Sequence, residues 1–309
     1  MKVKRLHLEE ANRFAREIGD HSDWVQGGGG NFSIKMNNGY MLIKASGFSL
    51  KDVNQKQGLV MVGADRVKKY YQSLNKKKIT VALENKSVKE IAKQTTDFLN
   101  VGNIRASIET GFHAFLQTYV LHTHSVYANV FTCSKKGEER LQNIFSSTKI
   151  RIAWVPYASP GFGLPRAIEL VRIKFIRTTG LEPHVFFLEN HGLIVQADTV
   201  NACLGLHKSV DRILRIALNT KAVFAKLTVP ETVDRSLFEP ILFPDQVVYL
   251  NGKKKVDLGS NRVMKETAIA YLFIKQQILK MGGVLNPLEK KSVVFIKKME
   301  SEKFRQRVL

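Results

Sequence analysis

Short apolar runs alternate with longer amphipathic stretches along most of this 309-residue chain. This alternation is typical of a layered α/β domain, in which helices cover the faces of a sheet. The runs expected to form strands are 31–35, 40–45, 58–62, 118–123, 151–157, 184–189, 192–196 and the region of 247–250. We expect helices over 1–20, 87–98, 104–116 and 198–224, after strand 58–62, and from about 262 and 287 onwards.

Local signals refine this pattern. Asn37-Asn38-Gly39 has the composition of a hairpin turn between the first two strands. Ser87 followed by Glu90 predicts a capping box at a helix start. No repeat, low-complexity segment or long linker divides the chain. We therefore expect one domain over 1–309, with a C-terminal helical extension over about 255–309.

The chain is strongly basic, with a formal net charge of +21 and a pI of about 9.9. Such a charge could attract nucleic acid, an anionic surface or phosphorylated substrates, or could simply be spread over a solvated surface. The lysine runs 76–78, 253–255 and 290–291 are short and lack interleaved aromatic residues. Nucleic-acid binding is therefore not favoured.

The N-terminus predicts a helix rather than a signal peptide, because Ala11, Phe14, Ala15 and Ile18 form one apolar stripe. No apolar stretch reaches the ~18 residues of a membrane span. The only cysteines, Cys133 and Cys203, are too few for a disulfide framework and suit a reducing cytoplasm. The sequence thus indicates a cytoplasmic protein without a membrane segment.

His122-Thr123-His124 follows an apolar run. Residues i and i+2 of a strand face the same side, so both imidazoles can converge on one metal ion. His191 is the natural third ligand, because it lies in an Asn-His-Gly turn between two apolar runs, where Gly192 gives the backbone freedom. A satisfied histidine pair and an exposed turn histidine are the plainer interpretations, and either motif alone is weak.

Glu109 is the candidate acid/base, at the start of the 104–116 segment. A hairpin of that helix with the next strand could place it beside the metal, with His113 on the same helix face. A helix-start glutamate favoured by the macrodipole is the simpler interpretation. The glycine run 27–30 before Asn31, and Ala45-Ser46-Gly47-Phe48, could cradle an oxyanion or serve as connectors.

Together these motifs resemble the class II aldolase/adducin family. The pieces that carry the resemblance, in family order, are 27–35 (GGGGNFSIK), 44–47 (KASG), 107–110 (SIET), 122–124 (HTH) and 189–193 (ENHGL). The likeness is greatest to the aldolase region of bifunctional rhamnulose-phosphate aldolase/alcohol dehydrogenase proteins. There it extends through 107–116, 155–162, 243–250 and 299–306.

The resemblance implies a three-layer α/β/α fold around a largely antiparallel sheet, and a homotetramer with active sites near subunit interfaces. It also implies a zinc ion held by His122, His124 and His191, with Glu109 catalytic. Phosphate binding would map to Asn31, Ser46, Gly47 and Ser107. Three imidazoles also accept manganese, cobalt or iron.

This chain departs from simpler fuculose-phosphate aldolases at Ile108, which follows Ser107 where they have a second serine. One side-chain phosphate donor is thereby in doubt. The dehydrogenase domain of the bifunctional relatives is also not expected, because the sequence has no Gly-x-Gly-x-x-Gly fingerprint.

The reaction implied is reversible cleavage of a ketose 1-phosphate to dihydroxyacetone phosphate and an aldehyde. Glu109 would carry the proton of the enediolate carbon, its pKa raised toward working pH by desolvation. Two alternatives stay open. One is a sugar-phosphate 4-epimerase on the same scaffold; the other is a non-catalytic adducin-like interaction module, in which the metal ligands tend to be lost.

Overall fold

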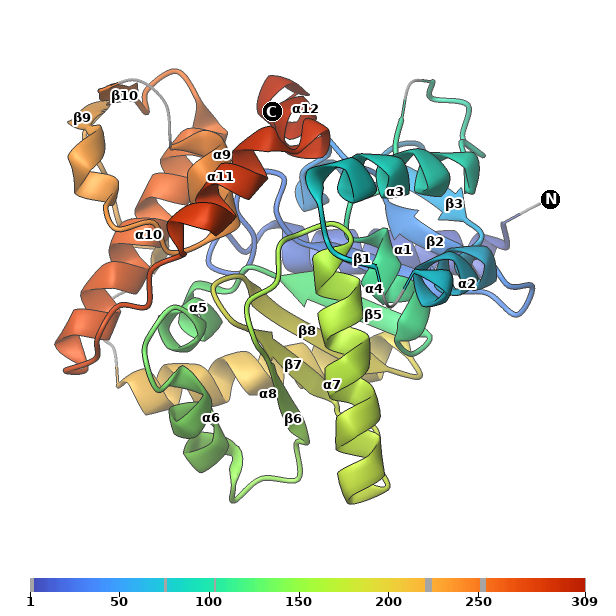
Figure 1. Cartoon of the computed structure of the whole chain (residues 1–309), viewed down its shortest axis with the longest axis horizontal. Helices are drawn as coiled ribbons and strands as arrows, with labels where there is room; N and C mark the ends of the chain where they lie inside the picture. The colour runs from blue at the N-terminus through green and yellow to red at the C-terminus, as the bar shows by residue number, and fades with distance from the viewer. Residues whose placement is uncertain (1–2, 75–76, 103, 220–223, 251–253, 309) are drawn as a thin grey trace.

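The computed structural model describes residues 3–74, 77–102, 104–219, 224–250 and 254–308. A single eight-stranded sheet forms its centre (Figure 1). In spatial order its strands are β4 (Thr95–Thr96), β3 (Leu59–Val62), β2 (Met41–Lys44), β1 (Asn31–Lys35), β5 (Tyr119–Thr123), β8 (Gly192–Ala197), β7 (Val185–Leu188) and β6 (Ile152–Val155). Neighbouring strands are antiparallel except for the parallel pair β6–β7.

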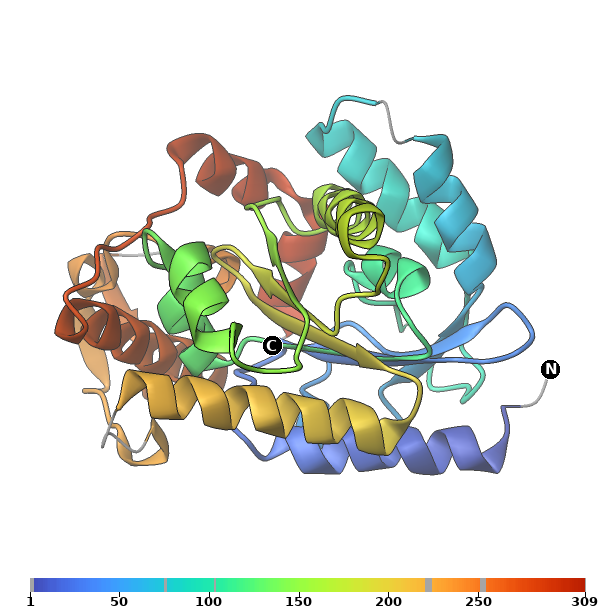
Figure 2. The same ribbon diagram turned by 90° about the horizontal axis from the view of Figure 1, so that it is seen from below.

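Helices cover both faces of this sheet. Figure 2 shows α1 (Arg5–Gly19) and α8 (Val200–Leu218) along one face. Helices α5 (Val126–Thr132) and α6 (Gly137–Phe145) pack into the same core as α1 and α8. The opposite face carries α2 (Ala64–Ser73), α3 (Val81–Lys93), α4 (Thr110–Phe115) and α7 (Gly163–Thr179). The predicted three-layer fold around a largely antiparallel sheet is therefore confirmed.

The C-terminal part packs beside these layers. It contains the two-stranded sheet of β9 (Thr232–Asp234) and β10 (Lys255–Asp257), the short η2 (Phe224–Lys226) and η3 (Arg235–Phe238), and helices α9 (Pro244–Tyr249), α10 (Arg262–Lys280), α11 (Lys290–Lys298) and α12 (Glu300–Val308). Helix α10 packs on α5, where the rings of Tyr127 and Phe273 meet edge to face at 5.5 Å. Helix α12 returns to contact α3 and α9. The single-domain assignment stays a prediction.

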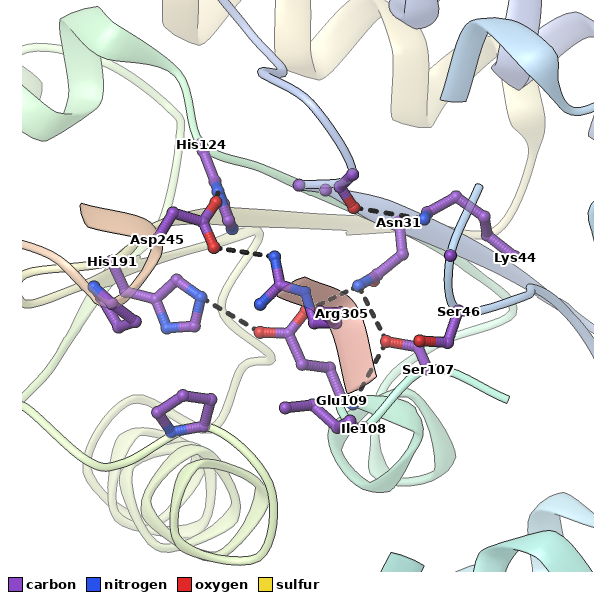
Figure 3. A pocket seen from close by; sticks show the side chains of 16 residues that line it. Asn31, Lys44, Ser46, Ser107, Ile108, Glu109, His124, His191, Asp245 and Arg305 are labelled. Atoms are coloured by element: carbon purple, nitrogen blue, oxygen red, sulfur yellow. Dashed lines mark hydrogen bonds and ion pairs between the residues drawn. The ribbon is translucent and has the colours of Figure 1, made fainter. Parts of the chain in front are cut away.

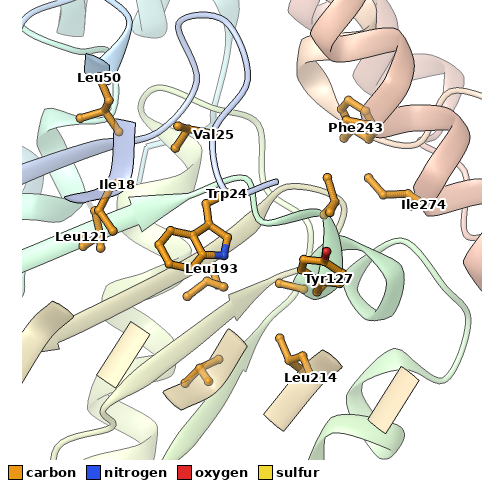
Figure 4. Packing of buried hydrophobic residues seen from close by; sticks show 14 of the residues in the cluster. Ile18, Trp24, Val25, Leu50, Leu121, Tyr127, Leu193, Leu214, Phe243 and Ile274 are labelled. Carbon is orange, nitrogen blue, oxygen red and sulfur yellow. The ribbon is translucent and has the colours of Figure 1, made fainter. Parts of the chain in front are cut away.

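The central strands do not alternate apolar and polar residues, because both faces of the sheet are buried. In β1, Phe32 packs toward α1, where its ring stacks on Phe14 at 5.1 Å, while Ser33 bonds His113 of α4 on the other face. Every residue of β1 except the last is buried. A sheet covered on both sides selects near-continuous apolar strands with a few satisfied polar positions. Figure 4 shows the larger core, in which Leu121 and Leu193 of adjacent strands lie beside Trp24.

Several predicted elements are confirmed. The hairpin turns at residues 37–39, with Gly39 at φ 78° and Lys35 paired to Met41. The N-terminal helix spans residues 5–19 and buries the predicted stripe of Ala11, Phe14, Ala15 and Ile18. The long helix predicted over 198–224 is observed at 200–218, and residues 220–223 of it lie outside the described part. The lysine runs 76–78 and 253–255 also fall partly outside it.

Other boundaries were wrong. Residues 247–249 lie within helix α9 and Leu250 follows as its C-cap, because Pro244 sits in the first turn of a helix and fixes its φ there. Helix α3 begins six residues before Ser87, and Thr80 rather than Ser87 caps it by accepting a hydrogen bond from the Leu83 N–H. The segment 104–116 is helical only over 110–115. Helices α5, α6 and α7 were not predicted.

Among the residues that the structure describes, no helix combines the length and the apolar character needed to cross a bilayer.

Replacing Phe14 tests the packing of α1 on the sheet. Phe14 is fully buried, whereas Leu6 of the same helix is 59% exposed. We expect Phe14→Ala to lower the free energy of unfolding by about 3–5 kcal/mol, because it leaves a cavity against Phe32. Leu6→Ala should change it by less than about 0.5 kcal/mol. Denaturant titration of both variants measures the difference, and equal losses would contradict this packing.

Candidate metal centre

Strand pairing brings His122 next to Asn31 and to the third histidine. His122 is paired across β5 with Asn31 of β1 on one side and with Ile194 of β8 on the other. His124 follows directly after the last residue of β5, and both imidazoles turn to the same side, as the i, i+2 spacing predicts. The end of a central strand thus presents two buried rings at one point.

His191 reaches this point from the tight turn between β7 and β8. The left-handed residue of the turn is Asn190, at φ 55°, and not Gly192 as expected. Glycine is needed at 192 for a different reason: a Cβ there would lie 2.3 Å from the carbonyl oxygen of Thr123. The turn therefore packs closely against the end of β5, and this contact places His191 beside His124.

The three rings form a nearly regular triangle. Their centroids are 5.0 Å apart for His122 and His124, and 5.1 Å apart for each of these with His191. One ligand nitrogen from each ring lies within 4.8 Å of the other two, and all three side chains are buried. The structure thus gathers the predicted trio at one site. Figure 3 shows two of its members, His124 and His191, in the pocket that they line.

Hydrogen bonds to the outer ring nitrogens fix which atoms face inward. The Nδ1 of His122 lies 2.9 Å from the carbonyl oxygen of Leu193, and the Nδ1 of His124 lies 2.9 Å from the Asp245 Oδ2. Both Nδ1 atoms must donate, because their partners only accept. Burial also lowers the pKa of His122 to about 3, so this ring is neutral. The Nε2 of His122 therefore carries a lone pair, and it faces the Nε2 of His124 at 3.1 Å.

A metal ion placed between these two nitrogens would take the place of the proton that a hydrogen bond between them requires. The third ring fits the same purpose: the Nδ1 of His191 is buried without a hydrogen-bond partner among the described residues. Three neutral imidazoles with a free fourth position form a donor set that zinc accepts. The residues present thus fit a divalent metal ion.

Glu109 lies at the edge of this triangle. Its Oε1 is 3.0 Å from the His191 Nε2, and its Oε2 is 3.6 Å from the His122 Nε2. Burial pulls the pKa of Glu109 upward, but the hydrogen bond from His191 and the surrounding imidazoles favour its charged form and hold the pKa well below that of an ordinary carboxyl group. The expectation of a raised pKa was wrong, because it counted desolvation and omitted the neighbouring rings. Glu109 is ionised and can accept a proton.

A buried chain of polar groups orients Glu109 from behind. The Nδ1 of His113 accepts from the Ser33 hydroxyl at 2.8 Å, and its Nε2–H donates to the Asn31 Oδ1. Burial lowers the pKa of His113 well below its usual value, so the ring stays neutral and keeps one donor and one acceptor. The amide of Asn31 is thereby fixed with its Nδ2 donating to Glu109 at 2.6 Å.

The residues predicted to bind phosphate line the same pocket as Glu109, His124 and His191; they are Asn31, Ser46, Gly47 and Ser107. Gly47 adopts φ 85°, which favours glycine and turns the loop backbone toward the pocket. The Ser107 hydroxyl accepts from the Glu109 backbone N–H at 3.2 Å. Ile108 also lines the pocket in place of a second serine. The cavity measures about 30 Å³, enough for one ion or water.

Three charged residues of this pocket were missed by sequence reasoning: Lys44, Asp245 and Arg305. Lys44 donates to the carbonyl oxygens of Phe48 at 2.7 Å and Gly28 at 3.3 Å, and so ties two glycine-containing loops together. Burial lowers the pKa of its amine to about 7. The motifs 44–47, 243–250 and 299–306 contained all three residues, but only the fold shows that distant segments meet here.

The buried carboxylate of Glu84 holds the segment next to Pro160, a residue that lines the pocket. Glu84 of α3 accepts hydrogen bonds from the backbone N–H groups of Phe162 at 2.5 Å and Gly163 at 3.2 Å. Gly161, at φ 92°, leaves room for this carboxylate, since a Cβ there would lie 2.2 Å from its Oε2. Burial raises the pKa of Glu84 to about 7, and the two N–H donors offset this only in part.

Comparison with known proteins gives consistent matches. Residues 10–218 match the model of the Class II Aldolase and Adducin N-terminal domain family. A solved N-terminal class II aldolase domain from Thermoplasma acidophilum is 22% identical, with a TM-score of 0.55 over 70% of this chain and 95% of that one. The L-fuculose-1-phosphate aldolase of Thermus thermophilus is 16% identical, with a TM-score of 0.44 over 70% of this chain and 94% of that one.

A curated relative, the "Uncharacterized oxidoreductase YuxG" of Bacillus subtilis, is 29% identical over 127 residues. That alignment covers 39% of this chain and 17% of the relative. This chain therefore matches only a small part of that protein's length.

The raised pKa of Glu84 predicts a pH-dependent stability. The folded chain holds a proton that the unfolded chain releases between pH 4.5 and about 7. The free energy of unfolding should therefore fall as pH rises through this window, by on the order of 3 kcal/mol from this group. Denaturant titrations at several pH values should show a shallower fall for Glu84→Gln. Identical pH profiles of the variant and the wild type would contradict the assignment.

Proposed function

Because the chain belongs to the class II aldolase and adducin family, we propose that it is a divalent-metal-dependent aldolase. Its reaction would be the reversible cleavage of a ketose 1-phosphate to dihydroxyacetone phosphate and an aldehyde. The observation that carries the proposal is the buried triangle of His122, His124 and His191 with the Glu109 carboxylate at its edge. An interaction module has no use for such an arrangement.

In this proposal the three histidines hold the ion, with zinc favoured by all-nitrogen ligation and manganese or cobalt as alternatives. When bound, the ion supplies Lewis-acid stabilisation of the negative charge that develops on the substrate oxygens. The chain prepares the rings for this role: the Leu193 carbonyl and the Asp245 carboxylate hold both Nδ1–H groups and leave the Nε2 lone pairs free.

Glu109 moves the proton. As the carbon–carbon bond breaks, the hydroxyl group of the departing half gives up its proton to become the aldehyde, and the electron pair of the bond stays on the carbon next to the carbonyl group. The resulting enediolate takes up a proton at that carbon to give dihydroxyacetone phosphate, so the ionised Glu109 must first gain the proton that it delivers. In the synthetic direction the ionised Glu109 removes the same proton. Its hydrogen bond from Asn31, which His113 fixes in turn, keeps the carboxylate facing the reacting atoms.

The phosphate end would lie against the donors of Asn31, Ser46, Gly47 and Ser107. These groups are neutral, and Figure 3 shows Ser46 and Ser107 across the pocket from His191, so a bound ketose would extend from them toward the histidines. We also propose the homotetramer that the family resemblance implies, which light scattering after gel filtration would test.

Two substitutions separate metal binding from proton transfer. Glu109→Gln should keep zinc and lose about 10²- to 10⁴-fold in turnover, the usual contribution of general acid–base catalysis. His122→Ala should lose the metal itself. His207→Ala serves as the matched control, since His207 is equally buried and bonds Thr123 at 2.9 Å, outside the metal triangle. Metal analysis and product assay on a panel of ketose 1-phosphates measure these effects.

Each part of the proposal can fail separately in this experiment. Formation of an epimer without free aldehyde would replace the aldolase by a 4-epimerase. Protein that binds no divalent metal would favour the interaction module. Full turnover of Glu109→Gln would remove the assigned role of the carboxylate.

A further inference from the structure

The C-terminal helix contributes a side chain to the metal centre. Helix α12 lies against α9 and α3, and its Arg305 lines the pocket together with Glu109, His124 and His191. Figure 3 shows the guanidinium pointing into the pocket next to Asp245. The Arg305 side chain is only 14% exposed, so its charge is largely removed from water. A buried guanidinium is stable only where it has specific partners.

The main partner is the carboxylate behind a metal-ligand candidate. An Arg305 terminal nitrogen (Nη2) donates to the Asp245 Oδ1 at 2.7 Å, and the other oxygen of Asp245 accepts from His124 at 2.9 Å. Resting on the proposed function, we propose that Arg305 is a positioning residue for the metal centre. It fixes Asp245 in the orientation that holds the His124 imidazole, so that α12 completes the metal-binding site.

The two contacts made by the guanidinium of Arg305 support this role. The second terminal nitrogen of Arg305 (Nη1) donates to the Glu302 Oε2 at 2.9 Å, and the guanidinium lies 5.7 Å from the ring of Tyr249. Arg305 thus joins one carboxylate of its own helix to one carboxylate of α9, with little freedom to rotate. A planar guanidinium can make both contacts at once, which the single ammonium of lysine does less well.

The positive charge of Arg305 is a second reason to assign it this positioning role. Asp245 and Glu302 are both buried, and each disfavours the ionisation of the other. Arg305 compensates this repulsion. Lys44, the other basic residue of this pocket within the described ranges, directs its amine to the carbonyl oxygens of Phe48 and Gly28 instead. Without Arg305, a buried Asp245 would lose its charged partner and would no longer be held toward His124.

The consequence is a change in metal affinity. The carboxylate behind a metal-binding imidazole sets the tautomer and the ring orientation, and its loss typically weakens metal binding about 10- to 100-fold. Arg305 acts one step further from the ion, through that carboxylate. We expect Arg305→Ala to raise the dissociation constant for zinc about tenfold.

The test is a competition titration of the full-length metal-free protein with zinc and a chromophoric chelator. Arg305→Lys should weaken zinc binding less than Arg305→Ala, because it keeps the charge and loses the fork. Arg172→Ala is the control, since Arg172 of α7 likewise joins two carboxylates, Glu169 and Glu182, but does not line the pocket. It should leave zinc affinity unchanged. Thermal unfolding of the metal-free variants checks that each is folded, and Arg305→Gln replaces the alanine variant if that one is not.

A double-mutant cycle with Asp245→Asn shows whether Arg305 acts through Asp245. In the Asp245→Asn background, Arg305→Ala should cause little further loss of zinc affinity. Full additivity of the two substitutions would overturn the inference. Unchanged zinc affinity of Arg305→Ala would overturn it too, and a lower KM of that variant would then indicate that Arg305 restricts access to the pocket. Wild-type protein that binds no zinc would overturn the proposed function as well, so the two failures are distinguishable.

Discussion

The facing Nε2 atoms of His122 and His124, 3.1 Å apart, are the constraint around which this site is organised. Either a proton or a metal ion between them satisfies both nitrogens. Both rings are locked in place by hydrogen bonds to Leu193 and Asp245. The fold therefore uses buried interactions to hold two imidazole nitrogens close enough to share one cation, an arrangement that is common at functional sites.

That arrangement was predictable from sequence where one strand or one turn determines it. The i, i+2 spacing on β5 places His122 and His124 together, and the turn between β7 and β8 supplies His191. The layered fold was predictable for the same reason, because apolar runs and amphipathic stretches are local signals. The resemblance to a family strengthened the catalytic role of Glu109 and the phosphate role of Asn31, Ser46 and Gly47, and added Ser107; these roles stay predictions.

What sequence reasoning missed depends on contacts between distant segments. Asp245 lies just before residues 247–250, which suggest a strand, yet Pro244 begins a helix there, and the Asp245 carboxylate meets His124. Arg305 is one of many basic residues in a chain of net charge +21, and nothing local marks it as buried. The pKa of Glu109 was misjudged for a related reason: the imidazoles that lower it come from other segments of the chain. Such effects follow from tertiary packing alone.

The central claim is that one ion sits among the three imidazoles, and anomalous diffraction from crystals of the zinc-loaded protein tests it most directly. The account predicts a single strong peak about 2.0–2.1 Å from one nitrogen each of His122, His124 and His191. A peak elsewhere, or rings that keep their present contacts with no density between them, would contradict it.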